Sequence, residues 1–330
     1  MYDQRQYFRQ RLNGLSGGAL WGLDTVLIGL ILAHGPFQYF AGTAPLIATF
    51  LHDSFSAMVL LILNIISNPK NYFFNFLRIL KKSPSAHWVM FAAVFGGPVG
   101  MTGYALSIHY IGPTYTAIIS AMYPAFGALL NFIVFRQRPN LSTIVGLSLA
   151  IGGTIFTGMS ATITTNIRPI GFIFAALCVI GWGSESVISA YGMKNDLSSD
   201  DALQIRQLIS GIVFAVGIIP IVPSGYHHVF EIFHSPIIFL LLLTAIAGSL
   251  SYKFYYGSIN VLGAVQAMGL NISYSAWAIV IGIVVGNKAS LTSLLLASII
   301  ILGSVLTADS KQLILRKIPI VARMIPKEHK

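Results

Sequence analysis

Two pairs of residues, each a tryptophan with an acid, have the types and spacing to bind a ligand. In each pair the acid follows the tryptophan by three positions: Trp21 with Asp24, and Trp182 with Glu185. This spacing puts both side chains on one face of a helix. An indole face attracts a desolvated cation by about 0.5–2 kcal/mol, and the acid supplies the opposite charge. The pattern therefore predicts a site for an organic cation.

Both pairs lie inside apolar runs that are long enough to cross a bilayer, which takes about 20 residues. An ionisable side chain near the bilayer centre costs roughly 2.5–3.5 kcal/mol, so we expect Asp24 and Glu185 to face a cavity. Charges inside a membrane also neutralise each other. A structural pairing of these acids with Arg206 or His52 is therefore the alternative to ligand contact.

The composition is that of a membrane protein with many spans. Of the 330 residues 55% are hydrophobic and only 9% are charged, and the mean hydropathy is +0.76. A net charge of +10 would suggest nucleic acid as partner of a soluble protein, but here the charges sort by their position relative to the spans. The lone Cys178 excludes a disulfide within the chain and is expected to pack. The sequence predicts an all-α integral membrane protein that lies in the lipid bilayer and does not bind nucleic acid.

Ten spans are predicted from the apolar runs. They are 13–34, 43–66, 87–110, 113–134, 141–160, 170–191, 202–222, 236–257, 262–286 and 290–308. Lysines and arginines gather on one side of them: in segment 1–12, in the connections after even-numbered spans and in the basic tail, 309–330. Only Arg168 and Lys288 fall on the other side. The positive-inside rule then places both termini in the cytoplasm and the protein in the cytoplasmic membrane.

The two halves of the chain match each other. An offset of 161 places Trp21 on Trp182 and Asp24 on Glu185, and an offset of 151 places Gly112 on Gly263. Spans one to five (13–160) therefore correspond to spans six to ten (161–308). An odd number of spans in each half makes the repeats inverted, with a substrate site near the midplane between them and alternating access as the expected mechanism.

Further side chains are candidates for the same site or for its movement. Trp277 lies well inside a span, away from the interfacial belt where tryptophan gathers. We expect the box to be completed by Trp277 and by Tyr115, Tyr123 and Tyr274, although each tyrosine could instead pack between helices. The candidates for coupling or gating are His52, Asp53, Arg206 and Pro98. Protons are candidate coupling ions.

Two local features bear on the helices. The glycine-rich stretch 96–103 contains Pro98, which removes a helix hydrogen bond and is expected to break the third span. The 67–86 connection reads as a helix lying at the membrane interface.

Several kinds of enzyme site are not indicated. The sequence has no phosphate-binding loop, no His-Glu-x-x-His and no Gly-x-Ser-x-Gly. His52 and Asp53 lack a positioned nucleophile for intramembrane catalysis. We expect no enzyme activity, no cofactor and no metal site.

The chain resembles the drug/metabolite transporter superfamily with paired EamA-like repeats, over nearly its whole length. Several stretches are similar to bacterial choline permeases of the LicB type: 97–101, 120–125, 181–186, 202–207 and 269–274. The resemblance implies that choline sits in a box lined by Trp21, Trp182 and Trp277, with Glu185 as the acid.

Import of choline or a close quaternary ammonium compound by alternating access is therefore the expected function. The alternative within transport is export of amino acids or other small metabolites, and a structural or receptor-like protein is the alternative outside it. The acids inside the spans favour a cation as substrate. A monomer or a homodimer is expected.

Overall fold

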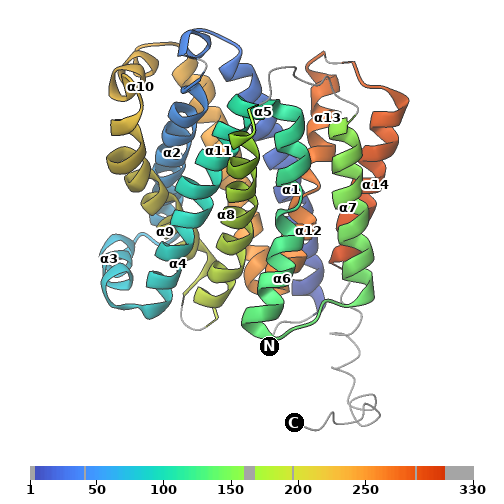
Figure 1. Ribbon diagram of the computed structural model, residues 1–330. Coiled ribbons are helices and arrows are strands. Elements are labelled where there is room, and N and C mark those ends of the chain that lie inside the picture. The colour runs from blue at the N-terminus through green and yellow to red at the C-terminus, as the bar shows by residue number, and fades with distance from the viewer. Residues whose placement is uncertain (1–3, 41, 160–167, 195–196, 287, 309–330) are drawn as a thin grey trace.

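The chain folds into a bundle of upright helices whose ends lie at two opposite faces (Figure 1). The computed structural model describes residues 4–40, 42–159, 168–194, 197–286 and 288–308. Within these ranges every regular element is a helix, which confirms the expected all-α class. The expected basic tail, 309–330, lies outside the described residues, as do residues 1–3 of the N-terminal segment.

The elements follow the apolar runs of the sequence. The first half contains α1 (Gln4–Leu32), η1 (Phe37–Phe40), α2 (Ala44–Ser67), α3 (Tyr72–Lys82), α4 (Pro84–Val94), η2 (Phe95–Met101), α5 (Thr102–Ser120), α6 (Tyr123–Phe135) and α7 (Leu141–Met159). The second half contains α8 (Ile170–Gly192), α9 (Ser199–Val213), η3 (Phe214–Ile218), η4 (Ile219–Ile221), α10 (Gly225–Phe233), α11 (Ile237–Leu262), α12 (Ala264–Asn271), α13 (Tyr274–Val284) and α14 (Leu291–Thr307).

Nine helical segments among the described residues are long and apolar enough to cross a membrane. The shorter apolar α14 stands where the tenth span is expected, and its 17 residues are at the lower limit for a crossing. Nine of the ten observed segments agree with the predicted spans to within five residues at both ends, whereas α1 begins nine residues early, at Gln4. The chain is a multi-pass membrane protein, and the ten expected spans are compatible with its helices.

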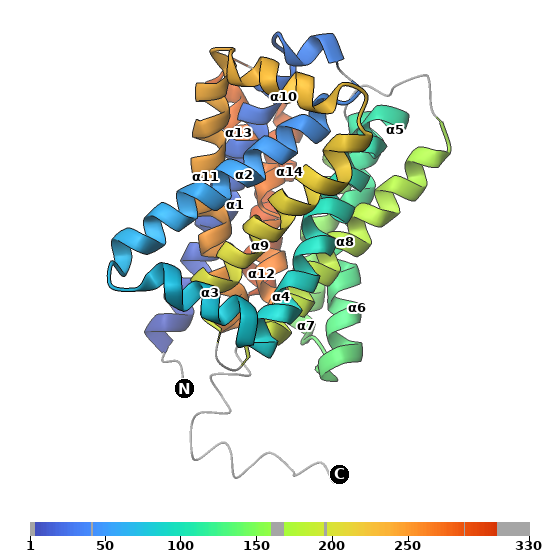
Figure 2. The same cartoon turned by 90° about the vertical axis from the view of Figure 1, so that its left-hand side faces the viewer.

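The helices pack in matching pairs. Helix α1 packs on α11 and α13. Helix α8, the counterpart of α1 in the second half, packs in the same way on α5 and α6. Helix α2 packs on α9, and Figure 2 shows these two side by side between α10 and α3. This pairing supports the predicted matching halves. The boundary between them, at residues 160 and 161, falls in a segment outside the described residues and stays a prediction.

Two glycines break long helical runs at corresponding points. Gly112 has φ 78° and ψ 166°, and Gly263 has φ 95° and ψ 164°. Side chains rarely adopt such backbone angles, whereas glycine does so without strain. The two residues are 151 positions apart, the offset that relates the halves in the sequence.

The predicted break in the third span takes the form of a π-helix. Element η2 contains Pro98, which is buried, and the glycines around it let other helices approach closely. A Cβ atom on Gly96 would overlap the Glu185 side chain, and one on Gly100 would overlap Trp182. Such π-helical turns are frequent at functional sites. The break therefore brings this span against the second tryptophan–acid pair.

Two short helices lie at opposite faces of the bundle, α3 at one and α10 at the other (Figures 1 and 2). Helix α3 occupies the connection that was expected to hold an interfacial helix, and Lys81 and Lys82 occupy its last turn. Helix α10 was missed by the sequence reasoning. Its exposed Tyr226, Phe230 and Phe233 recur at intervals of four and three residues, and this helical spacing is the signal that could have revealed it.

Helices α7 and α14 touch through their backbones at small residues. The Thr143 hydroxyl donates to the Thr307 carbonyl oxygen at 3.1 Å. A Cβ atom on Gly146 would overlap backbone atoms of Thr307 and Gly303. Small residues that permit such close approach are typical of helix contacts in membranes.

Replacement of Gly146 by leucine should lower the melting temperature, because the added side chain forces α7 and α14 apart. Gly152 on the same helix is the matched control, since a Cβ atom there meets nothing within 4 Å. Gly152→Leu should unfold at or above the wild-type temperature, because leucine favours a helix over glycine by roughly 1 kcal/mol. Thermal unfolding of the three proteins in one detergent measures this; equal melting temperatures would contradict the proposed contact.

Candidate functional site

Two neighbouring cavities lie between the helices that carry the tryptophan–acid pairs. The smaller, about 30 Å³, is here called the Glu185 chamber. The larger, about 230 Å³, is called the Asp24 cavity. The residues that border both spaces are Trp21, Trp182, Tyr252 and Tyr274. Aromatic rings therefore separate the two acids.

Helix α8 positions the second pair. Trp182 and Glu185 both line the Glu185 chamber, as their spacing predicted. The Glu185 Oε1 atom accepts hydrogen bonds from Arg206 Nε at 2.9 Å and from the Tyr256 hydroxyl at 2.9 Å. Glu185 is buried, with 5% of the residue exposed. The sequence gave two alternatives for Glu185, a position facing a cavity and a pairing with Arg206. The structure shows both.

Arg206 on α9 is fully buried and its guanidinium connects three other helices. Besides Glu185 on α8, it donates from Nη1 to Asp53 Oδ2 on α2 at 2.9 Å. Its Nη2 donates to the Tyr252 hydroxyl on α11 at 3.0 Å, and its charge lies 4.7 Å from the centre of that ring. Charge-assisted bonds of this kind are stronger than neutral ones and fix geometry.

His52 extends the network to the first acid. Its Nε2 lies 3.1 Å from Asp24 Oδ1, and its Nδ1 lies 3.3 Å from Asp53 Oδ1. A neutral imidazole has one N–H and can satisfy only one of these oxygens, whereas the protonated ring donates to both. The Ser210 hydroxyl also donates to Asp53, at 2.6 Å. The arrangement can therefore hold one proton on a ring between two carboxylates.

The charges in this connected network do not balance. It contains three carboxylates, one guanidinium and one imidazole. With the imidazole neutral, two negative charges are in surplus; with the imidazole protonated, one remains. Buried charge is costly unless it is paired. A monovalent cation in either cavity reduces the surplus, and an anion would increase it.

Aromatic rings form the walls beside these acids. The ring centres of Trp21 and Tyr252 lie 5.0 Å apart, and those of Tyr104 and Trp182 lie 5.2 Å apart. Tyr123 meets Trp182 edge to face at 5.8 Å. Each ring has two faces, and an electron-rich face that is not covered by a neighbouring ring can meet a cation.

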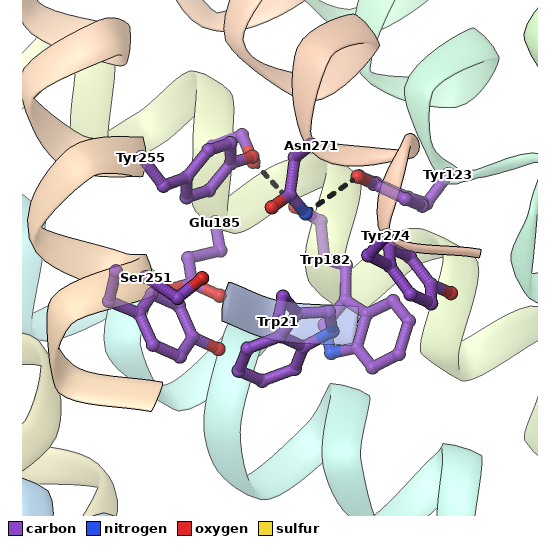
Figure 3. Close-up of a pocket in the computed structure, with 10 residues that line it drawn as sticks. Trp21, Tyr123, Trp182, Glu185, Ser251, Tyr255, Asn271 and Tyr274 are labelled. Carbon is purple, nitrogen blue, oxygen red and sulfur yellow. Dashed lines mark hydrogen bonds between the residues drawn. The ribbon is translucent and has the colours of Figure 1, made fainter. Parts of the chain in front are cut away.

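Figure 3 shows how the rings face the Glu185 chamber. Trp21 and Trp182 lie together on one side, and Tyr255, Asn271 and Tyr123 lie across from them. The Asn271 side chain donates to the Tyr123 hydroxyl at 3.1 Å. The chamber thus combines aromatic walls, one carboxylate and a few polar groups.

The structure brings most of the predicted side chains together. Those that line one or both cavities are Trp21, Asp24, His52, Asp53, Tyr123, Trp182, Glu185 and Tyr274. Arg206 lies directly behind them. Two candidates for ligand contact lie elsewhere: the ring centre of Tyr115 lies 6.1 Å from that of Phe172, and Trp277 lies against Gly22. Neither is in the lining of the two cavities, and a ligand role for either stays a prediction.

Sequence reasoning missed several residues of the site. These are Tyr104, Tyr252, Tyr255, Tyr256, Ser251 and Asn271. The three tyrosines of the stretch 252–256 are close together inside one span, where a polar hydroxyl needs a partner. That clustering was the available signal.

Removal of Arg206 should destabilise the protein strongly. The variant Arg206→Gln leaves Asp53 and Glu185 buried without the guanidinium that pairs with both, which costs on the order of 3–5 kcal/mol. The triple variant Arg206→Gln with Asp53→Asn and Glu185→Gln should regain part of the loss, because both partners of the guanidinium are then neutral as well. Thermal unfolding of wild type, single and triple variants is the measurement. A single variant as stable as wild type would show that the pairs contribute little.

The chain is similar to known proteins in sequence and in fold. Residues 12–159 match the model of the EamA-like transporter family. Protein LicB of Haemophilus influenzae is 34% identical over 192 residues, which cover 58% of this chain and 64% of that protein. A crystal structure that covers 97% of this chain, and is itself covered to 99%, superposes with a TM-score of 0.66 at 16% identity. This last similarity shows the fold alone.

Proposed function

We propose, from the match of residues 12–159 to the EamA-like transporter family model, that this chain is a secondary transporter that imports choline or a close quaternary ammonium ion. One observation carries the proposal: the network around Arg206 has surplus negative charge and borders two cavities walled by aromatic rings. The resemblance of several stretches to bacterial choline permeases adds support.

A quaternary ammonium ion cannot donate a hydrogen bond, so it must be recognised by ring faces, shape and a nearby negative charge. The Glu185 chamber offers these features. Trp21 and Trp182 supply the ring faces, and Glu185 supplies the charge from a side chain that Arg206 and Tyr256 hold in place. A fixed carboxylate loses little conformational freedom when the ligand arrives, which favours binding.

The arrangement of helices fits alternating access. The acids come from α1 and α8, which occupy corresponding places in the two halves, and the guanidinium that joins α2 to α8 comes from α9. Rocking of one half against the other would change access to a site between them. Pro98 in the π-helix beside Glu185 is a candidate for the point of bending.

The expected topology is consistent with import. The positive-inside rule places the N-terminus in the cytoplasm and the Leu32 end of α1 outside, in the cytoplasmic membrane. The Asp24 cavity reaches along α1 to Leu32, so it lies in the outer half. A cation arriving from outside would meet this cavity first.

The alternative, export of amino acids or other small metabolites, finds less support. A substrate carboxylate needs a free cation in the cavity. Arg206 is fully buried and its nitrogens are already bonded to Glu185, Asp53 and the Tyr252 hydroxyl. The acids that do border the cavities would repel such a substrate.

Uptake of radiolabelled choline into proteoliposomes tests the proposal. A potential of about 100 mV, inside negative, is worth roughly 2.3 kcal/mol for one charge. Potential-driven import should therefore concentrate choline up to about fifty-fold. Uptake is measured without any gradient, with the imposed potential, and with an imposed pH gradient alone. The pH gradient is included because His52, between two carboxylates, is the candidate proton carrier. Absence of uptake under all conditions would contradict the proposal.

Two variants in the same assay separate binding from folding. Glu185→Gln should reduce uptake at least about tenfold, through loss of the charge beside the cation. Trp182→Phe should retain more uptake than Trp182→Leu, because only the former keeps an aromatic face. Thermal unfolding of each variant shows whether it is folded. If all three folded variants take up choline as fast as the wild type, neither Glu185 nor Trp182 belongs to the site.

A further inference from the structure

The Asp24 cavity has a polar end and an apolar end. Trp21, Asp24 and His52 lie at the polar end. Its lining continues along α1 from Trp21 to Leu32, a rise of about 16 Å for eleven residues. The lining also includes Met101 from η2 and Ile108 from α5. The cavity is thus elongated, with charge at one end only.

The two cavities differ in what they can hold. A water molecule needs roughly 10–15 Å³, so the Glu185 chamber, at about 30 Å³, has room for about two waters and must widen to take a quaternary ammonium head. The Asp24 cavity, at about 230 Å³, has room for an organic ion without such a change. Choline has a short polar substituent that would not reach the apolar end.

We propose that the Asp24 cavity is a binding subsite for amphiphilic quaternary ammonium ions, whose head lies at Asp24 and Trp21 and whose alkyl tail follows α1 to Leu32. This inference deepens the proposed function, on whose cation chemistry it rests, and adds a tail-binding region that choline does not use. The subsite binds its ligand with the Glu185 chamber in its narrow form.

The head has a specific acid to meet. Asp24 is 4% exposed and is bonded through Oδ1 to His52, which Asp53 contacts from the other side. Two carboxylates therefore share one imidazole, and a quaternary cation beside Asp24 supplies positive charge that the imidazole alone does not. The indole of Trp21, one helical turn earlier on α1, supplies a ring face.

The alkyl tail would contact an apolar wall of the cavity. Ile28, Leu32 and Ile108 line the cavity beyond the polar end. Each methylene group that leaves water for such a wall strengthens binding about three- to fourfold. Affinity should therefore rise steeply along a series of butyl-, hexyl- and octyltrimethylammonium, until the tail reaches the end of the cavity.

Gly29 gives a way to shorten the tail region without touching the head. It lines the cavity, and a Cβ atom there meets nothing within 4 Å, so Gly29→Leu places its side chain in free space. Gly152→Leu on α7 is the matched control, because a Cβ atom there is equally unobstructed and Gly152 is outside both linings. Both changes replace a helical glycine by leucine.

Isothermal titration calorimetry of the full chain in lipid nanodiscs tests the proposal, with the three alkyltrimethylammonium ions and with heats from empty nanodiscs subtracted. Wild type and Gly152→Leu should bind the octyl ion at least about tenfold more tightly than the butyl ion. Gly29→Leu should lose this gradient. Asp24→Asn should weaken all three ions at least about tenfold and keep the gradient.

A gradient that is the same in Gly29→Leu as in Gly152→Leu, or that disappears when empty nanodiscs are subtracted, would overturn the subsite. Its failure is distinguishable from failure of the proposed function. Choline uptake without a tail gradient would refute the subsite alone. A gradient that depends on Gly29 and Asp24, in a protein that takes up no choline, would support the subsite and refute choline import.

Discussion

The structure depends on the ion pairs that Arg206 makes with Asp53 and Glu185. A buried guanidinium destabilises the fold unless such partners neutralise it. The two carboxylates belong to residues 132 positions apart in the sequence. The pairs therefore fix α2, α8 and α9 against one another. They also leave negative charge in surplus, since His52 and Arg206 together cannot balance three acids.

Close helix contacts allow this network to form beside a cavity. Glycines in the π-helical segment η2 let it approach Glu185 and Trp182, where any larger residue would collide with them. Aromatic rings then enclose the space on the other side, with Trp21 and Tyr252 in edge contact at 5.0 Å. The same sequence features that close the bundle thus place ring faces and surplus charge next to one another, which is the chemistry an organic cation requires.

Much of this follows from local patterns in the sequence. Apolar runs give the spans, Pro98 gives the break, and a spacing of three puts Trp182 beside Glu185 because the segment is helical. Contacts across the bundle do not follow from local patterns. The partner of Arg206 on α2 is 153 residues away, and the inward direction of Tyr252 depends on how α11 rotates against α1. Helix α10 has nine residues, too few for any search based on membrane spans.

Comparison of choline with its uncharged carbon analogue, 3,3-dimethylbutan-1-ol, tests most directly whether surplus negative charge defines the site. The two molecules have nearly the same shape, and only choline carries a charge. Calorimetric titration of the protein in nanodiscs should show choline binding at least about tenfold more tightly, because only the cation relieves the imbalance around Arg206. Equal affinities would contradict the account.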